Sequence, residues 1–470
     1  MTTNYLVNSS NGKGVWKNID IFLMLFMLGF MMDKVVVKPV MISVALLCIG
    51  RYINWKGIFR TPLFYLIIPA FELVRFLLFQ HDFSKGHIFS FIVGESYWVM
   101  ALMAFIVVKT SVDRNSKAVI ETTLLTFFLI NTAMSFIQLG LTMYHSGSWN
   151  PYGLADPAYG GSTGDYIRGV WLAPCHINML LNALFAVYFL YRKKYLFSFI
   201  ASIVAMLTST NFGNIIFFAV AIQCLFLLRD NTARKIISLQ LITYVAFYLF
   251  LAPANFKYAT SALSEHKEKA ALDKKTVENA REKKNTTVRE EKRNGIPEDN
   301  IIKNGKLLSF EQTIQYATSG AGPLLIGAGM GNFSSLLALR TSGLHGRERS
   351  RFFERMPEYV SEDYRQNHYK IFKAVYELPE GYHSTRNFPH SFLNQIIGEY
   401  GLLGTFSFLI FYIGYFIRRW KTLTYSIPFG VLVCGFLCFD YLFEYLSVIV
   451  VFEMFFLLDL KREESVHEPS

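Results

Sequence analysis

Residues 170–228 read VWLAPCHINMLLNALFAVYFLYRKKYLFSFIASIVAMLTSTNFGNIIFFAVAIQCLFLL. This stretch holds apolar runs at 170–191, 195–210 and 212–228, separated by the basic group 192–194 and by a short polar turn. A bilayer core offers no water to hydrogen-bond the backbone, so a crossing segment must close its own hydrogen bonds, as a helix does. We therefore interpret each of these runs as a transmembrane helix.

The composition extends this interpretation to the whole chain. Of its 470 residues, 52% are hydrophobic, 16% are aromatic and 17% are charged, which excludes a disordered chain and argues against an ordinary soluble enzyme. The net charge of +11 does not indicate nucleic-acid binding, because Lys and Arg lie in short clusters between apolar runs and in one polar segment. The five cysteines show no disulfide or zinc pattern, and the polar start at 1–17 shows no signal-peptide cleavage pattern.

We predict an all-α polytopic membrane protein with about twelve transmembrane helices. The basic residues support this number, because their clusters all fall in even-numbered gaps, which the positive-inside rule assigns to the cytoplasm together with both termini. The clusters contain Lys13 and Lys17; Arg51, Lys56 and Arg60; Lys109, Arg114 and Lys117; Arg192 to Lys194; Arg229 to Lys235; Arg418 to Lys421; and Lys461 and Arg462. The predicted spans are 19–33, 35–50, 61–80, 87–108, 118–143, 170–191, 195–210, 212–228, 236–253, 391–417, 425–440 and 442–460.

A large non-cytoplasmic segment, 254–390, separates helices 1–9 (within 1–253) from helices 10–12 and a cytoplasmic tail (391–470). Its part 264–293 mixes Lys, Glu and Arg with almost no large apolar residue, and we expect a solvated helix or a mobile arm without a nucleic-acid role. The following part has apolar periodicity, aromatic residues and scattered Arg and His. We expect any chemistry to be housed there. The smaller non-cytoplasmic segment, 144–169, is rich in Gly, Pro, Ser and Asp and is predicted to be a loop.

Residues 383–404, HSTRNFPHSFLNQIIGEYGLLG, suggest a reactive histidine. Pro389 suits the first turn of a helix, so His390 would lie in that turn, at the non-cytoplasmic mouth of helix 10. An imidazole in that position can accept a proton near neutral pH, although an interfacial capping role is the alternative. The histidines of this region have no metal-ligand spacing, so no metal is predicted.

Two further segments suggest phosphate contacts. Arg168, before helix 6, would lie at the membrane surface, where a guanidinium can hold phosphate oxygens in a bidentate manner or serve only as an anchor. Gly327, Gly329 and Gly331 can cradle phosphate with their N–H groups or simply permit tight turns. Their spacing is not a dinucleotide fingerprint, and no nucleotide is expected.

Taken in order, these segments resemble the superfamily of O-antigen ligases and O-antigen or capsule polymerases over nearly the whole chain. The similarity rests on about twelve helices, a large periplasmic loop between helices 9 and 10, and three motifs. The matching residues are His390, Ser391, Leu393, Glu399, Gly401 and Gly404; Gly305, Lys306, Phe310, Gly327, Gly329, Gly331 and Phe333; and Arg168, Gly169, Trp171, Pro174 and His176.

The resemblance implies a GT-C-like membrane glycosyltransferase of the bacterial inner membrane. Its donor would be a polyprenyl-diphosphate-linked glycan met at the membrane lipid surface, with no cofactor and no nucleic acid, and with other polysaccharide-assembly proteins as further partners. His390 would be the base. Arg168, Lys306 and Arg386 would bind the diphosphate, while Glu399 and Tyr382 would contact the acceptor or glycan.

Two departures and one rival class bear on this expectation. The turn at 208–214 lacks the family's Arg, and Lys306 replaces another. These departures favour a polymerase, or a divergent subfamily, over a ligase that transfers the glycan to lipid A core. A lipid-linked glycan transporter or flippase is the alternative of another class. Charged residues within predicted spans support it: Glu72, Arg75, Glu95, Asp440, Glu444 and Glu453.

Overall fold

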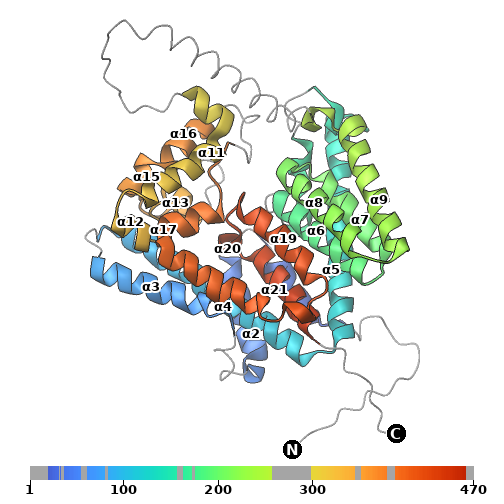
Figure 1. The fold of residues 1–470 in the computed structure, drawn as a ribbon, viewed down its shortest axis with the longest axis horizontal. Helices are drawn as coiled ribbons and strands as arrows, with labels where there is room; N and C mark the ends of the chain where they lie inside the picture. Colours follow the sequence, from blue (N-terminus) through green and yellow to red (C-terminus); the bar gives the residue numbers. More distant parts are fainter. Residues whose placement is uncertain are drawn as a thin grey trace, which may run out of the picture.

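The computed structural model describes residues 19–30, 32, 36–53, 61–79, 83–155, 162–171, 175–256, 298–344, 351–377 and 387–461. Within these ranges all regular elements are helices and no strand occurs, so the all-α prediction is confirmed there (Figure 1). The charged arm predicted at 264–293 lies outside the described residues.

Each predicted span coincides with a helix. In the first half these are α1 (Ile21–Phe30), α2 (Val37–Ile49), α3 (Phe64–Phe79), α4 (Lys85–Arg114), α5 (Lys117–Ser146), α6 (Cys175–Tyr191), α7 (Tyr195–Leu207), α8 (Asn211–Leu227) and α9 (Asn231–Ala246), which continues as a π-helix over Phe247–Leu251. In the last part they are α17 (Phe392–Ser407) with a π-helical turn and α18 (Gly414–Ile417), α19 (Ser426–Leu437), α20 (Leu442–Tyr445) and α21 (Ser447–Leu460).

Among the described residues, four helices are long and apolar enough to cross a membrane: Lys85–Arg114, Lys117–Ser146, Asn231–Leu251 and Phe392–Thr422. A bilayer core about 30 Å thick requires about 20 helical residues. The other apolar helices are shorter, and the number of crossings therefore stays a prediction.

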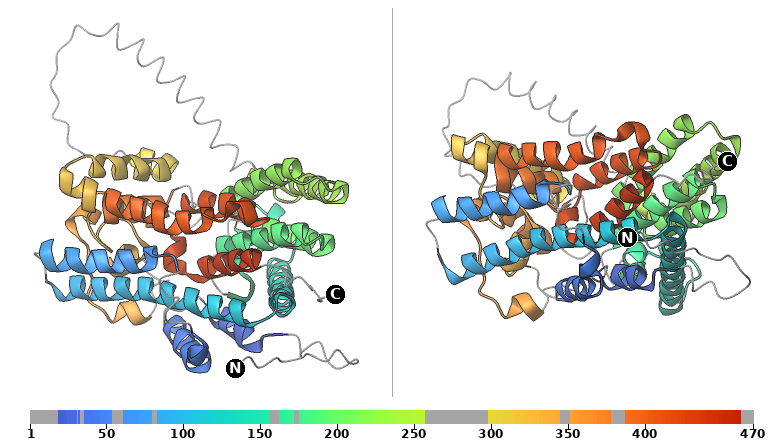
Figure 2. Two further views of the ribbon diagram at one scale, coloured as in Figure 1. Left: turned by 60° about the horizontal axis from the view of Figure 1, so that its bottom comes forward. Right: turned by 90° about the horizontal axis from the view of Figure 1, so that it is seen from below.

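The helices form two groups around a centre (Figure 1). α5 to α9 lie on one side, while α3, α11 to α16 and the start of α17 lie on the other, with α19 to α21 between them. In the second group, α11 packs on α17, α17 on α3, and α3 on α4, so that the helices form successive layers (Figure 2). α6 is buried along nearly its whole length and contacts α7, α8, α19 and α21.

The segment between α9 and α17 is helical and packed where the structure describes it. It contains α11 (Glu298–Ala317), α12 (Ala321–Ile326), α13 (Leu336–Thr341), α14 (Arg351–Glu354), α15 (Glu362–Gln366) and α16 (His368–Tyr376). Three of these helices contact the apolar helices directly, because α11 and α12 pack on α17 and α13 packs on α4. The segment is thus fixed to the apolar helices rather than suspended above them.

Polar contacts at His368 fasten α11 to α16 and α17. The His368 Nε2 atom lies 3.0 Å from the Ser309 carbonyl oxygen and 3.2 Å from Thr313 Oγ1. Asn394 of α17 completes the contact, donating to Ser309 Oγ over 2.9 Å and accepting from Thr313 Oγ1 over 2.9 Å. Burial lowers the pKa of His368 to about 3, so this imidazole is neutral at physiological pH. His368 is therefore a structural residue.

The glycine-rich segment is a site of close backbone approach. Gly327 and Gly329 have φ angles of +67° and +94°. The N–H groups of Ala328 and Gly329 donate to the carbonyls of Gly398 and Glu399 in α17 over 2.9 and 2.8 Å. These N–H groups are used within the fold, so the structure favours the tight-turn alternative over a phosphate cradle.

We expect Gly327→Ala to lower the free energy of unfolding by about 2–4 kcal/mol. A Cβ at Gly327 would lie 2.5 Å from the Glu399 carbonyl carbon, in a backbone conformation that L residues disfavour. The matched control is Gly322→Ala, because a Cβ there meets nothing within 4 Å and lies in helix α12. Thermal unfolding of the purified variants in detergent measures the difference, and equal melting temperatures would contradict the expectation.

Candidate active site

A buried carboxylate, Asp440, lies where the chain breaks between α19 and α20. The residue is 3% exposed. One oxygen, Oδ2, forms an ion pair with Nε2 of His176, at the start of α6, while Oδ1 accepts a hydrogen bond of 2.8 Å from the Tyr441 N–H. Asp440 also interacts electrostatically with His390. One carboxylate thus faces two imidazoles that come from distant parts of the sequence.

His390 is held beside this carboxylate by the start of α17. Ser391 caps the helix, accepting from the N–H groups of Leu393 and Asn394 over 3.1 and 3.4 Å. The next residue, Phe392, donates its N–H to the Asp440 carbonyl over 2.9 Å. The chain before α17 is therefore tied directly to the chain after α19. The sequence predicts His390 in the first turn of the helix, whereas in the structure it immediately precedes the capping residue.

Aromatic rings fix the orientation of the His390 imidazole. The ring stacks on Phe388 with a centroid distance of 5.0 Å and an interplanar angle of 17°. Phe372 of α16 and Tyr441 also contact it, at centroid distances of 5.3 and 5.2 Å. His390 therefore has a defined position with apolar walls.

Lys306 of α11 brings a cation to the same place. Its ammonium donates to the carbonyl of His390 and, over 3.3 Å, to that of Phe439. The residue is 5% exposed, and burial lowers the pKa of the ammonium to about 7, against the opposing attraction of Asp440. An anion arriving nearby would favour the protonated form. Lys306 thus fastens the segment before α17 to the segment after α19. Its ammonium can change charge near neutral pH.

Arg168 lies at the edge of this region, in the loop before α6. Its Nε donates to the Asp165 carbonyl over 2.8 Å, and its side chain is exposed. The backbone N–H groups of Arg168 and Gly169 both donate to Oε1 of Gln138 in α5, over 2.7 and 2.8 Å. Asp165 interacts electrostatically with Arg168 and with His176. The loop is thus fixed to α5. Through Asp165, Arg168 is linked to the cluster formed by His176, Asp440, His390 and Lys306.

The structure places the remaining predicted site residues elsewhere. Tyr382 and Arg386 lie outside the described residues. Glu399 lies about 13 Å along α17 from His390 and is completely buried, accepting from the Phe333 N–H over 3.4 Å. The cluster therefore joins His390 and Lys306 and approaches Arg168, but it does not contain Glu399.

The ion pair of His176 and Asp440 does not follow from the sequence. In the sequence, His176 is noted only as part of a motif match, and Asp440 is noted only as a charge within a predicted span. The residues are far apart in the sequence, and neither local periodicity nor spacing connects them. The available signal is that a carboxylate in an apolar segment requires a partner.

Other buried carboxylates have partners within one helix or on neighbouring segments. Glu72 pairs with Arg75 over 2.9 Å, as expected from their spacing on one helix face. Glu444 accepts the N–H groups of Leu336 and Leu337 at the start of α13, over 2.6 and 3.1 Å. Glu453 accepts the hydroxyls of Tyr65 and Tyr412, over 2.5 and 3.1 Å. These partners account for Glu72, Glu444 and Glu453, whereas Oε1 of Glu95 in α4 has no hydrogen-bond partner among the described residues.

The cluster of His176, Asp440, His390 and Lys306 therefore combines groups that can accept a proton with groups that can hold an anion.

No protein-family model, curated protein or solved structure matches the chain. Within the described residues, no three His, Cys, Asp or Glu side chains are arranged as a metal site. The chemistry of this cluster and the sequence motifs are therefore the basis for assigning a function.

Proposed function

We propose that the protein is a membrane glycosyltransferase that polymerises surface polysaccharide from polyprenyl-diphosphate-linked repeat units. The observation that carries the proposal is the convergence of His390, His176, Asp440 and Lys306 at the ends of apolar helices. A lipid-linked donor keeps its tail in the bilayer, so its diphosphate is available only at the level of the helix ends. The motif resemblance supplies the chemical class of the donor.

The proposed reaction transfers the glycan from diphosphate to a sugar hydroxyl. His390 removes the hydroxyl proton, the hydroxyl oxygen bonds to the anomeric carbon, and the bond from that carbon to the diphosphate oxygen breaks. The negative charge of Asp440 stabilises the imidazolium that forms. Arg168 and Lys306 hold the departing polyprenyl diphosphate, and Arg386 is a further candidate for this contact. Tyr382 remains a proposed glycan contact, whereas the complete burial of Glu399 disfavours such a contact for that residue.

The proposal includes about twelve crossings in the bacterial inner membrane, with both termini in the cytoplasm and residues 254–390 outside. The distribution of charge supports this orientation. Residues from four of the predicted cytoplasmic basic clusters line a single cavity: Lys117, Arg192, Arg419 and Lys461. His176 begins α6 and Arg192 follows its end, so the cavity and the active-site cluster lie about 25 Å apart along that helix.

The orientation predicts which cysteines an impermeant reagent can reach. In a variant without the native cysteines, we expect Lys370→Cys in α16 to be labelled from outside intact spheroplasts, whereas Lys235→Cys in α9 is labelled only after permeabilisation. Both positions are exposed in the structure, so accessibility reports the side of the membrane. Labelling of Lys235→Cys alone would reverse the orientation and leave the active site without a donor.

Substitutions of Arg168 test whether this residue contacts phosphate or only anchors the loop at the membrane. We expect Arg168→Lys to reduce polymerisation by roughly tenfold and Arg168→Ala by more, because Lys keeps the charge and loses the bidentate fork. The rate of elongation of a lipid-linked repeat unit by purified protein measures both. Wild-type rates in both variants would show that the residue is only an anchor.

Elongation by purified protein in detergent also separates enzyme from transporter, because detergent leaves no second compartment. We expect longer lipid-linked glycans to form, and their absence under conditions where the protein stays folded would contradict the proposal.

Deleting the gene distinguishes a polymerase from a ligase. Loss of the ladder with one repeat still attached indicates a polymerase, while accumulated lipid-linked polymer without attachment indicates a ligase.

A further inference from the structure

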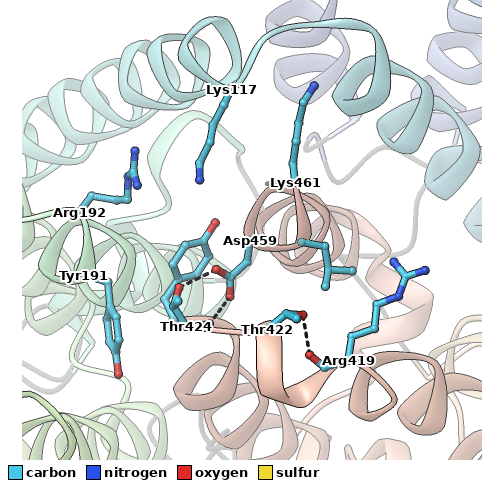
Figure 3. Close-up of a pocket in the computed structure, with 10 residues that line it drawn as sticks. Lys117, Tyr191, Arg192, Arg419, Thr422, Thr424, Asp459 and Lys461 are labelled. Carbon is cyan, nitrogen blue, oxygen red and sulfur yellow. Dashed lines mark hydrogen bonds between the residues drawn. The ribbon is translucent and has the colours of Figure 1, made fainter. Parts of the chain in front are cut away.

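A polar cavity lies at the other end of α6 from His176. Its volume is about 720 Å³. The ends of four helical segments form it: the start of α5, the end of α6, the stretch from α18 to α19, and the end of α21. Four basic side chains and one carboxylate, Asp459, line it (Figure 3). The cavity plays no part in the proposed reaction.

The carboxylate in this cavity is held by the protein itself. Both oxygens of Asp459 accept hydrogen bonds: Oδ1 from Thr424 Oγ1 over 2.6 Å, and Oδ2 from the N–H groups of Thr424 and Ser426 over 2.9 and 3.1 Å. Asp459 thus fixes the turn that leads into α19. The four lining cations exceed the charges of Asp459 and of Glu121, which pairs with Arg192, so the cavity keeps a positive net charge.

Contacts of Arg192 and Lys461 define the cavity wall. Arg192 pairs with Glu121 of α5 over 2.5 Å. Lys461 donates to the carbonyls of Val112, over 2.7 Å, and of Asn115 at the end of α4. Lys117 extends from its helix toward the region of Arg192 and Asp459, and Arg419 lies on the other side of Asp459 from Arg192 (Figure 3). Basic residues from separate helices therefore line one volume.

We infer that this cavity binds the phosphate of an anionic lipid headgroup. Arg and Lys together match phosphate oxygens, Arg through its planar fork and Lys as a point charge. A headgroup fits the position better than a soluble anion, because the cavity lies at the ends of apolar helices. Trp420, beside Arg419, is 56% exposed, as is typical of an aromatic residue at a membrane interface.

The test compares two double variants of the full-length protein that lose the same charge. Lys117→Gln with Arg419→Gln removes two lining cations and leaves Arg192 and Lys461 in place. Arg418→Gln with Lys421→Gln removes two exposed cations of the same region that do not line the cavity. Lys117→Arg with Arg419→Lys keeps both charges. Native mass spectrometry in neutral detergent measures the binding of phosphatidylglycerol, with phosphatidylcholine as the zwitterionic reference.

We expect the wild type, the charge-keeping variant and the exposed-site variant to prefer phosphatidylglycerol. The cavity variant should bind it about 20-fold more weakly, because two basic side chains no longer attract the phosphate. Melting temperatures show whether each variant is folded; if the cavity variant unfolds, weakened binding in the single variant Arg419→Gln decides the result.

Three results would overturn the inference. The first is no preference of the wild type for phosphatidylglycerol, and the second is equal weakening in both double variants. The third is full competition by millimolar inorganic phosphate, which would identify a soluble phosphate as the occupant. Polymerisation in detergent without anionic lipid tests the proposed reaction separately.

Discussion

His390→Ala is expected to lower the rate of glycan polymerisation by about 10²–10⁴-fold, the usual contribution of a general base. The structure gives this residue the required setting, because its ring stacks on Phe388 and lies beside the buried charge of Asp440. The initial rate of elongation of a lipid-linked repeat unit by purified protein measures the effect. Binding of the donor should change little, since the imidazole acts on the acceptor hydroxyl.

Chemical rescue separates the loss of a base from the loss of structure. The Ala variant leaves a space with the shape of an imidazole between Phe388 and Tyr441. Added imidazole should therefore restore part of the rate, whereas a misfolded protein would not respond. An unchanged rate in His390→Ala, with its folding shown by an unchanged melting temperature, would remove His390 from the mechanism.

The positions of the apolar helices could be predicted from the sequence, because hydrophobic runs and basic clusters report on them directly. Where the structure differs, local signals fail. α9 begins at Asn231, before the predicted start at residue 236, because Asp230 caps it by accepting the Thr232 N–H over 2.8 Å. The predicted last span is two helices, α20 and α21, since Leu446 adopts a φ angle of +62° between them. Such a break in an apolar run leaves no trace in hydropathy.

The sequence predicted individual residues of the site but not all of the contacts that join them. His390 and Lys306 stand out in sequence motifs, and the structure joins them through a hydrogen bond from the Lys306 ammonium to the His390 carbonyl. Asp440, by contrast, is recognised as a site residue only from the packing of α6 against α19, which brings His176 into contact with it. A single sequence contains no signal for that contact. The glycine-rich segment left two alternatives open in the sequence, and its backbone contacts with α17 favour the tight turns over the phosphate cradle.

Asp440→Asn is expected to lower the polymerisation rate by about 10²–10⁴-fold, the upper value being the loss that follows when a carboxylate that orients a catalytic histidine is neutralised. The change keeps the shape of the side chain and its contact with the Tyr441 N–H. It removes the negative charge that faces His176 and His390. Asp440 is a positioning residue in this mechanism, so kcat should fall while KM for the lipid-linked acceptor changes little.

The pH dependence distinguishes this role from a purely structural one. A nearby carboxylate favours the protonated form of an imidazole, and its removal makes protonation less favourable. The acidic limb of the kcat/KM profile should therefore move to lower pH in Asp440→Asn, even though the maximal rate is smaller. Asp113→Asn is the matched control, because Asp113 is exposed and pairs with Lys109 over 2.6 Å at the end of α4. A rate loss in Asp440→Asn with an unmoved acidic limb would mean that Asp440 supports the fold and does not set the charge of the base.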